Sequence, residues 1–334
     1  MPTKIPLNLK APIDLKSPIM IGPNSLSTVG VEVIPIFDKK ELLSWNQRFS
    51  EELLKFPEYL HPTKSTIYVY GGFGALGNPS SYHNPMVRDL RMKMMSFARP
   101  LFQSLKTHNY LEQLFDRMCI RRKDTKTTAE SWHRDIKEGL PETDEIFGGW
   151  INLDLDKTQY FSCVPGTHGD KGAKSGFAKI EKDQIDKYLS QKQIISVPPG
   201  HWVVFYQQIV HEVIPRKMTA DSYRVYLGFR LTNQTQPLYD YKTIIENQGV
   251  PSLPGGMSPP MYAAMNVNFH LKQLIEWSQI FDAKTLETKK NKKYGYMYQI
   301  VHRYMKSLKE YGFPLYPAYT EDEKNIMRPQ PLKS

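Results

Sequence analysis

Between Glu130 and Thr232 the chain is a succession of short β-type runs separated by turns that contain Pro or Gly. The runs are rich in β-branched and aromatic residues, and none is long enough to suggest a buried helix. They occupy residues 150–153, 202–211 and 222–230, with turns at 164–168 and 198–200. Short strands with this punctuation are typical of antiparallel sandwiches and barrels, so the sequence predicts an antiparallel double-stranded barrel.

Three side chains in this region are suited to bind a metal ion. His133 and Asp135 flank Arg134, so on an extended backbone they point to the same side while Arg134 points away. His211 ends the run that begins at Trp202, and a distant strand of the same barrel can bring it beside the pair. Two imidazoles and one carboxylate can occupy one face of Fe(II), leaving the opposite face for an organic acid and dioxygen.

These residues also have plain structural interpretations. With nine histidines in the chain, roughly 0.4 His-x-Asp pairs are expected by chance, so the pair alone is weak. The pair could lie on a surface strand, and His211 could be a hydrogen-bonded core histidine. Arg224, in the following run, could form a surface salt bridge with Asp221 or Glu212, which would contribute little stability. The order of the surrounding strands and turns favours the metal site.

With its motifs in this order, the segment from about Glu130 to Thr232 resembles the core of the Fe(II)/2-oxoglutarate-dependent dioxygenases, most closely the phytanoyl-CoA dioxygenase-like branch. The resemblance implies a mostly β fold with flanking helices (α+β), built on a double-stranded β-helix of the jelly-roll or cupin type. It implies that His133, Asp135 and His211 bind Fe(II) and that a turn, Pro165 to His168, lies between them. It also implies oxidative decarboxylation of 2-oxoglutarate to succinate and CO2, coupled to hydroxylation of a substrate C–H bond.

The resemblance further implies that Arg224 binds the far carboxylate of 2-oxoglutarate, which a planar guanidinium can grip through two parallel hydrogen bonds. Arg224 shares a strand face with Tyr226 and Arg230, and Arg230 is the second choice for this role. The alternate residues of this strand are Val225, Leu227 and Phe229. The face that carries Arg224 points inward only if these three residues pack against covering helices.

Weaker cofactor contacts are expected from three more residues. Trp150 and Asn152 fall in a predicted strand and are expected to line the cavity, although an aromatic strand residue is more often plain core. His168 is more readily a turn or supporting residue than a ligand, because the metal face already has three ligands.

The flanking sequence predicts three parts: an extended N-terminal arm over 1–30, a dioxygenase-like domain over 31–250 and a helical C-terminal extension over 251–334. Within the domain we expect a strand at 31–36, a helix capped by Asp38, a helix that begins at Asn84 and Pro85, and a second helix from Leu101 to Phe115. The buried face of the first helix is predicted to hold Leu42, Leu43, Trp45, Phe49, Leu53 and Leu54. In the extension, helices are expected at 261–281 and 296–311.

The segment Gly72-Phe73-Gly74-Ala75-Leu76-Gly77 formally matches the dinucleotide-binding glycine pattern. Asn78-Pro79-Ser80-Ser81 interrupts the helix that should receive the pyrophosphate, so we interpret the segment as a loop near the substrate mouth.

The formal charge of +10 invites an anionic partner. The run from Lys289 to Tyr296 mixes bases and aromatics as a nucleic-acid contact would, although charge runs are usually solvated surface. The basic cluster Arg121-Arg122-Lys123 could equally receive an anionic substrate, and the sequence does not choose between them.

Cys119 and Cys163 are too few and too far apart for a disulfide framework, and no stretch has the length and apolarity of a signal peptide or membrane span. A cytoplasmic or nuclear protein without membrane contact is therefore expected. Two competing functional classes remain: a non-catalytic jelly-roll structural or interaction protein, and a basic nucleic-acid-binding module.

Overall fold

The computed structural model describes residues 19, 21, 24–54, 84–124, 130–135, 143–170, 182–214, 217–237, 320–326 and 328–332. Its helices are α1 (Leu26–Val29), α2 (Lys39–Leu54), α4 (Pro85–Leu105), the 3-10 turn η4 (Thr167–Gly169), α5 (Lys182–Gln191) and α10 (Glu321–Ile326). Its strands are β1 (Val31–Pro35), β2 (Tyr110–Arg121), β3 (Glu130–His133), β4 (Glu145–Asn152), β5 (Gln159–Val164), β6 (Gln193–Val197), β7 (His201–Tyr206), β8 (Val210–Val213), β9 (Ser222–Thr232) and β10 (Gln330–Pro331).

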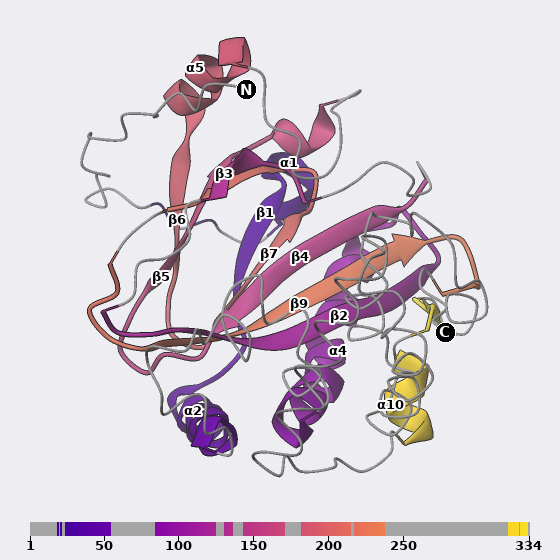
Figure 1. Ribbon diagram of the computed structural model, residues 1–334. Coiled ribbons are helices and arrows are strands. Elements are labelled where there is room, and N and C mark those ends of the chain that lie inside the picture. Colours follow the sequence, from indigo (N-terminus) through magenta and orange to yellow (C-terminus); the bar gives the residue numbers. More distant parts are fainter. Residues whose placement is uncertain are drawn as a thin grey trace, which may run out of the picture.

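The strands form two antiparallel sheets (Figure 1). The large sheet has the order β1-β7-β4-β9-β2-β10, and the small sheet has the order β3-β8-β5-β6. From β2 to β9 each strand lies in the other sheet from the strand before it, except that β5 and β6 are neighbours in the small sheet. This is the predicted double-stranded β-helix with flanking helices, so the expectation for the fold class is confirmed.

The large sheet separates two apolar cores because successive side chains along a strand point to opposite faces. On the inner face, Val203 and Phe205 of β7 pack with Phe161 and Ile195 of the small sheet. On the outer face, Trp202 of β7 packs with residues of α2 and α4. Figure 1 shows these two helices on the side of the large sheet away from β5 and β6. Of the candidate metal ligands, His211 contacts Phe161 and Phe205 of this inner core.

The two covering helices begin where the sequence predicts. Asp38 accepts a hydrogen bond from the backbone N–H of Glu41 (2.8 Å), and the Glu41 carboxylate accepts one from the N–H of Asp38 (3.4 Å), which forms a capping box for α2. Asn84 accepts from the N–H of Val87 (2.9 Å), with Pro85 at the first position of α4. In α2 the predicted face is buried except at Leu43 and Leu54, which are 55% and 63% exposed.

The prediction of a helix from Leu101 to Phe115 was wrong. Helix α4 continues to Leu105 through Pro100, and Lys106 ends it in the left-handed conformation (φ 57°). Residues 110–121 then form β2, which pairs with β9. A register shift between Gln113 and Asp116 interrupts the alternation of this strand, so no two-residue period is visible over its full length.

The two terminal parts contain local structure that the sequence did not predict. Within the supposed extended arm, Leu26–Val29 form a short helix and Ile19 makes a parallel bridge to Ile195 of β6. Near the other end, β10 adds a strand to the edge of the large sheet, paired with β2 at Tyr110 and Leu111. The glycine-rich segment at 72–77, the basic run at 289–296 and the helices expected at 261–281 and 296–311 lie outside the described residues.

Candidate metal centre

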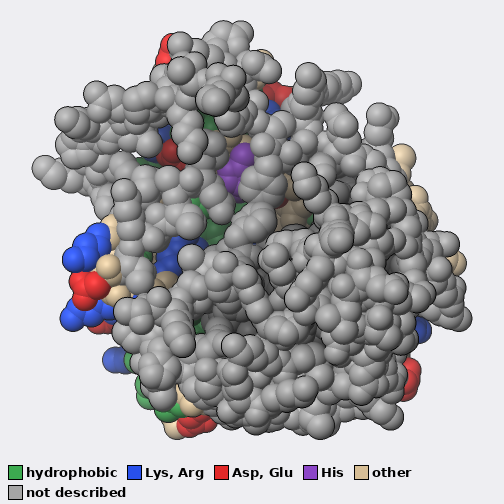
Figure 2. All heavy atoms as spheres, in the orientation of Figure 1, with side chains coloured by type: hydrophobic (Ala, Val, Ile, Leu, Met, Phe, Trp, Pro, Cys, Tyr) green, Lys and Arg blue, Asp and Glu red, His purple; other side chains and the backbone are tan. Residues whose placement is uncertain are grey.

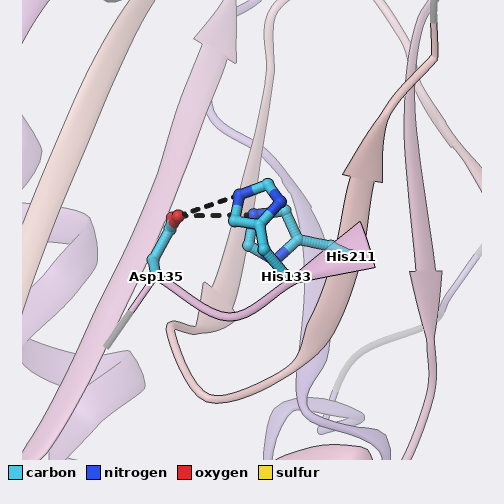
Figure 3. A group of neighbouring side chains, drawn as sticks. All are labelled: His133, Asp135 and His211. Carbon is cyan, nitrogen blue, oxygen red and sulfur yellow. Dashed lines mark ion pairs between the residues drawn. The ribbon is translucent and has the colours of Figure 1, made fainter. Parts of the chain in front are cut away.

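The structure brings His133, Asp135 and His211 together, as Figure 3 shows. His133 ends β3 and lies directly opposite His211 of β8 in the antiparallel register, so both imidazoles leave neighbouring strands on one face. Asp135 follows β3, and its backbone N–H donates to the carbonyl of Gln207 (2.9 Å) in the turn before β8. The carboxylate is thereby turned back towards the two rings, whose centroids are 4.3 Å apart.

The spacing of the three side chains fits one ion. Oδ1 of Asp135 lies 3.3 Å from Nε2 of His133 and 3.6 Å from Nε2 of His211, and the three candidate ligand atoms lie within 4.8 Å of one another. Two ligand atoms bound at right angles to one ion, each about 2.1 Å away, are separated by about 3 Å. The two Asp135 contacts are within a few tenths of an ångström of this spacing.

The tautomer of His211 is also set for metal binding. Its Nδ1 lies 3.0 Å from the carbonyl oxygen of Ile209, which can only accept, so Nδ1 carries the proton and Nε2 presents a lone pair. Burial lowers the pKa of His211 by more than Asp135 raises it, so the imidazole is held neutral at ordinary pH. A neutral imidazole is the form that binds a metal ion.

Asp135 has the charge state that a ligand requires. Burial raises the pKa of Asp135, but the imidazoles of His211 and His133 and the hydroxyl of Tyr226 outweigh burial, and the pKa lies below its ordinary value. Its side chain is 21% exposed, against 5% for His133 and 8% for His211. Figure 2 shows histidine side chains near basic and hydrophobic ones on one face of the molecule.

The turn after β5 supports the two histidine strands. Thr167 Oγ1 donates to the carbonyl of Val164 (2.7 Å) and accepts from the N–H of Val210 (2.9 Å), the residue before His211. Arg134 points away from the centre, as predicted, and its guanidinium donates to the carbonyl of Thr167 (2.7 Å) and to that of Gln208. Thr167 and Arg134 therefore connect the segments that carry all three candidate ligands.

Arg224 lies on the inner face of β9. The alternate residues Val225, Leu227 and Phe229 belong to the outer core with the covering helices, which is the condition under which Arg224 faces inward. Its guanidinium carbon lies 4.7 Å from the centroid of the Trp150 ring, and Arg224 is 8% exposed. Tyr226, two residues along the same face, reaches Asp135, so Arg224 and the centre share the interior of the barrel.

Asn152 and Arg230 are occupied by the scaffold. The Asn152 amide donates to the carbonyls of Lys157 and Val197 and accepts from Asp154 and Gln159, at 2.8–2.9 Å, which exhausts its hydrogen-bonding capacity. Arg230 donates to Asp144 (2.6 Å) and Glu112 (2.8 Å), both deeply buried. The expected contact of Asn152 with a cofactor therefore loses its basis, as does the second choice of Arg230.

The structure places His168 outside the barrel interior. Its ring stacks on Tyr206 at a centroid distance of 4.8 Å, and a Cβ added at Gly30 would lie 2.4 Å from its Nδ1. Tyr206 belongs to the outer core, whereas its neighbour Phe205 belongs to the inner core and contacts His211. His168 thus packs between Gly30 and Tyr206. This position fits a residue that supports the turn rather than one that binds a cofactor.

Sequence reasoning missed Tyr226 as a member of the centre. Its hydroxyl lies 3.3 Å from Oδ2 of Asp135. Burial, followed by the Asp135 carboxylate, raises the pKa of Tyr226 well above its ordinary value, so the phenol keeps its proton and donates. The available signal was the shared strand face of Arg224 and Tyr226; the contact itself depends on how β3 and β9 face each other across the barrel.

No protein-family model matches the chain, and no curated protein matches it. Solved structures that it resembles include SnoK, described as a non-heme alpha-ketoglutarate-dependent carbocyclase from nogalamycin biosynthesis: 14% identity, TM-score 0.45, covering 66% of this chain and 88% of that one. AviO1 from Streptomyces viridochromogenes Tue57 is 15% identical, with a TM-score of 0.44, and the match covers 61% of this chain and 91% of that one. HygX from Streptomyces hygroscopicus, crystallised with nickel, 2-oxoglutarate and hygromycin B, is 14% identical, with a TM-score of 0.42, and the match covers 63% of this chain and 87% of that one. Similarity at these values assigns no function to this chain.

Among the described residues, no helix combines the length and apolarity needed to cross a membrane.

Proposed function

We propose that the protein is an Fe(II)- and 2-oxoglutarate-dependent oxygenase that hydroxylates a C–H bond of its substrate, with release of succinate and CO2. The observation that carries the proposal is the convergence of His133, Asp135 and His211 on one face, with Nε2 of His211 left available by its Nδ1 contact. Two imidazoles and one carboxylate on one face are the donor set that non-heme Fe(II) oxygenases use.

The residues of the chain have separable roles in this proposal. His133, Asp135 and His211 would bind Fe(II), which, together with 2-oxoglutarate and dioxygen, supplies the oxidising chemistry. Arg224 would bind the far carboxylate of 2-oxoglutarate through charge-assisted hydrogen bonds. Arg224 and Tyr226 are two residues apart along β9, or about 6.6 Å, which is of the same order as the length of a five-carbon diacid.

The surroundings of the centre limit access of water. Phe161 and Phe205 lie with ring centroids 5.5 Å and 5.3 Å from that of His211, and both belong to the inner core. Trp150 packs edge-on against Phe161 and lies under the Arg224 guanidinium. Such an apolar wall strengthens the ionic contacts made inside the barrel and shields reactive species from solvent.

Calorimetric titration with Mn(II), a redox-inert stand-in for Fe(II), tests the metal site. We expect the wild type to bind one ion and His133→Ala to bind none, whereas His168→Ala should bind as the wild type does. His168→Ala is the matched control, because it removes an imidazole from the outer side of the large sheet. Absence of binding in the wild type, or equal binding by His133→Ala, would refute the metal site.

Titration with 2-oxoglutarate then tests the cofactor. Binding should require Mn(II) and should be lost in Arg224→Met, which keeps much of the side-chain length but removes the donors. With Fe(II), dioxygen and 2-oxoglutarate, slow release of succinate without added substrate would demonstrate oxidative competence. An Arg224→Met variant that binds 2-oxoglutarate with wild-type affinity would contradict the role of Arg224.

A further inference from the structure

The two oxygens of the Asp135 carboxylate have different neighbours. Oδ1 faces the Nε2 atoms of both His133 and His211, at 3.3 Å and 3.6 Å. Oδ2 faces the hydroxyl of Tyr226, which donates to it over 3.3 Å. Figure 3 shows the carboxylate directed towards the two rings. One oxygen is thus presented to the metal position and the other is engaged by a phenol.

A glycine makes room for that phenol. A Cβ added at Gly148 of β4 would lie 2.6 Å from Oη of Tyr226 and 3.2 Å from two ring atoms of Phe205. A carbon atom does not tolerate a 2.6 Å approach, so alanine at this position would displace the hydroxyl. Gly148 does not have a positive φ, so its backbone conformation is open to alanine. The substitution therefore acts by filling space.

A cation holds the ring from the neighbouring strand. Arg117 of β2 lies directly opposite Tyr226 in the antiparallel register, and its guanidinium carbon is 4.5 Å from the ring centroid. A guanidinium over an aromatic face is attracted to the negative charge of that face. The ring is therefore constrained by Arg117, and the position of its hydroxyl depends on the space at Gly148.

We propose that Tyr226 is a positioning residue that keeps Asp135 bound to the metal through one oxygen, and that the absence of a side chain at Gly148 leaves space for the Tyr226 hydroxyl. The inference rests on the proposed function, since it concerns the same metal. Carboxylates can bind metal ions through one oxygen or two. A hydrogen bond to Oδ2 opposes the two-oxygen mode, so the coordination position that Oδ2 would occupy stays available to an organic acid or dioxygen.

Mn(II) titration of Tyr226→Phe tests the hydroxyl, with Tyr206→Phe as the matched control. Tyr206 loses the same atom, but its hydroxyl contacts Glu145 (3.5 Å) on the outer side of the sheet. We expect 10–100-fold weaker binding in Tyr226→Phe, the usual effect of removing a hydrogen-bond partner of a metal ligand, and wild-type affinity in Tyr206→Phe. Unchanged affinity in Tyr226→Phe would overturn the inference. A wild type that binds no Mn(II) would instead overturn the proposed function.

Gly148→Ala and the double variant test the role of the glycine. Gly148→Ala should weaken Mn(II) binding with Tyr226 still present, and Gly148→Ala/Tyr226→Phe should bind no more weakly than Tyr226→Phe, because the methyl group acts through the hydroxyl. Additive losses would show that Gly148 acts by another route. Thermal melts identify any variant that fails to fold, in which case the remaining single variant carries the test.

Visible absorption of bound Co(II) separates positioning from general destabilisation. The intensity of these bands depends on coordination number, which rises if Asp135 supplies a second oxygen. We expect the spectrum of Tyr226→Phe to differ from that of the wild type and of Tyr206→Phe, all measured at saturating Co(II). Identical spectra would contradict the one-oxygen role.

Discussion

Replacing Thr167 by Val removes the hydroxyl that fastens the β5 turn to the His211 strand, while nearly preserving side-chain shape. The hydroxyl donates to the carbonyl of Val164 and accepts from the N–H of Val210, and both of these residues are fully buried. Water therefore cannot replace the lost partner without opening the turn. Thr167→Val should both destabilise the fold and loosen the backbone next to His211.

The size of the effect follows from the two groups left unsatisfied. A buried backbone donor or acceptor that loses its partner costs about 1–3 kcal/mol. Two such groups, in part relieved by relaxation, give a loss of about 2–4 kcal/mol, a large fraction of the ~5–15 kcal/mol that stabilises a typical domain. Thr167→Ser retains the hydroxyl and loses one methyl group, which costs about 0.8 kcal/mol.

Urea denaturation of the metal-free proteins measures this difference. A lower midpoint at constant slope reports lost stability without a change in the surface exposed on unfolding. We expect Thr167→Val to lie at least about 1 kcal/mol below Thr167→Ser, and Mn(II) titration of the folded proteins to show weaker binding only for valine. Equal stability of the two variants would refute the bridging role of the hydroxyl.

Two further predictions concern buried polar groups away from the metal. Asn152→Ala should lower the free energy of unfolding by at least about 2 kcal/mol, because three buried partners and one partly buried partner lose their contacts. Asn46→Ala, which removes one donor to the Leu153 carbonyl (2.8 Å), should cost less, and equal costs in urea denaturation would contradict the scaffold role. Glu323 of α10 is paired with Arg88 of α4 (2.6 Å); burial raises the pKa of Glu323, but this pair and the Thr320 contacts hold it below its ordinary value. A depressed carboxyl pKa stabilises the folded state above the unfolded pKa, about 4.3, and that contribution is lost as pH falls through the folded value. Wild type should therefore exceed Glu323→Gln in stability at pH 7 and approach it below about pH 4, whereas a pH-independent difference would refute the linkage.

The sequence predicted those parts of the fold that local rules determine. The alternation over residues 222–230 identified both faces of β9, and capping residues located the starts of α2 and α4. It failed at Leu101 to Phe115, where a helix with an internal proline continues further than expected and a strand with a register shift follows. Local pattern cannot reveal that β10, from the far end of the chain, pairs with this strand at Tyr110 and Leu111.

The candidate site divides in the same way. His133 and Asp135 are two residues apart, so strand geometry alone relates their side chains, and His211 needed only the expectation of a neighbouring strand. Tyr226 and Gly148 belong to the centre through cross-strand register and atomic clearance, neither of which is a sequence pattern. For Asn152 the strand position indicated only a face, whereas its four hydrogen bonds, to Asp154, Lys157, Gln159 and Val197, follow from tertiary contacts.

Histidines 168 and 211 show why the position of a side chain relative to the large sheet decides its chemistry. Both lie close to turns, and the ring of each contacts an aromatic ring of β7. His168 meets Tyr206 and His211 meets Phe205, and consecutive strand residues point to opposite faces, so one imidazole is outside the barrel and the other inside. The same side chain therefore supports the fold in one place and faces Asp135 in the other. Comparing His168→Ala with His211→Ala in metal binding therefore changes the location of the deleted imidazole while keeping the deleted chemical group the same.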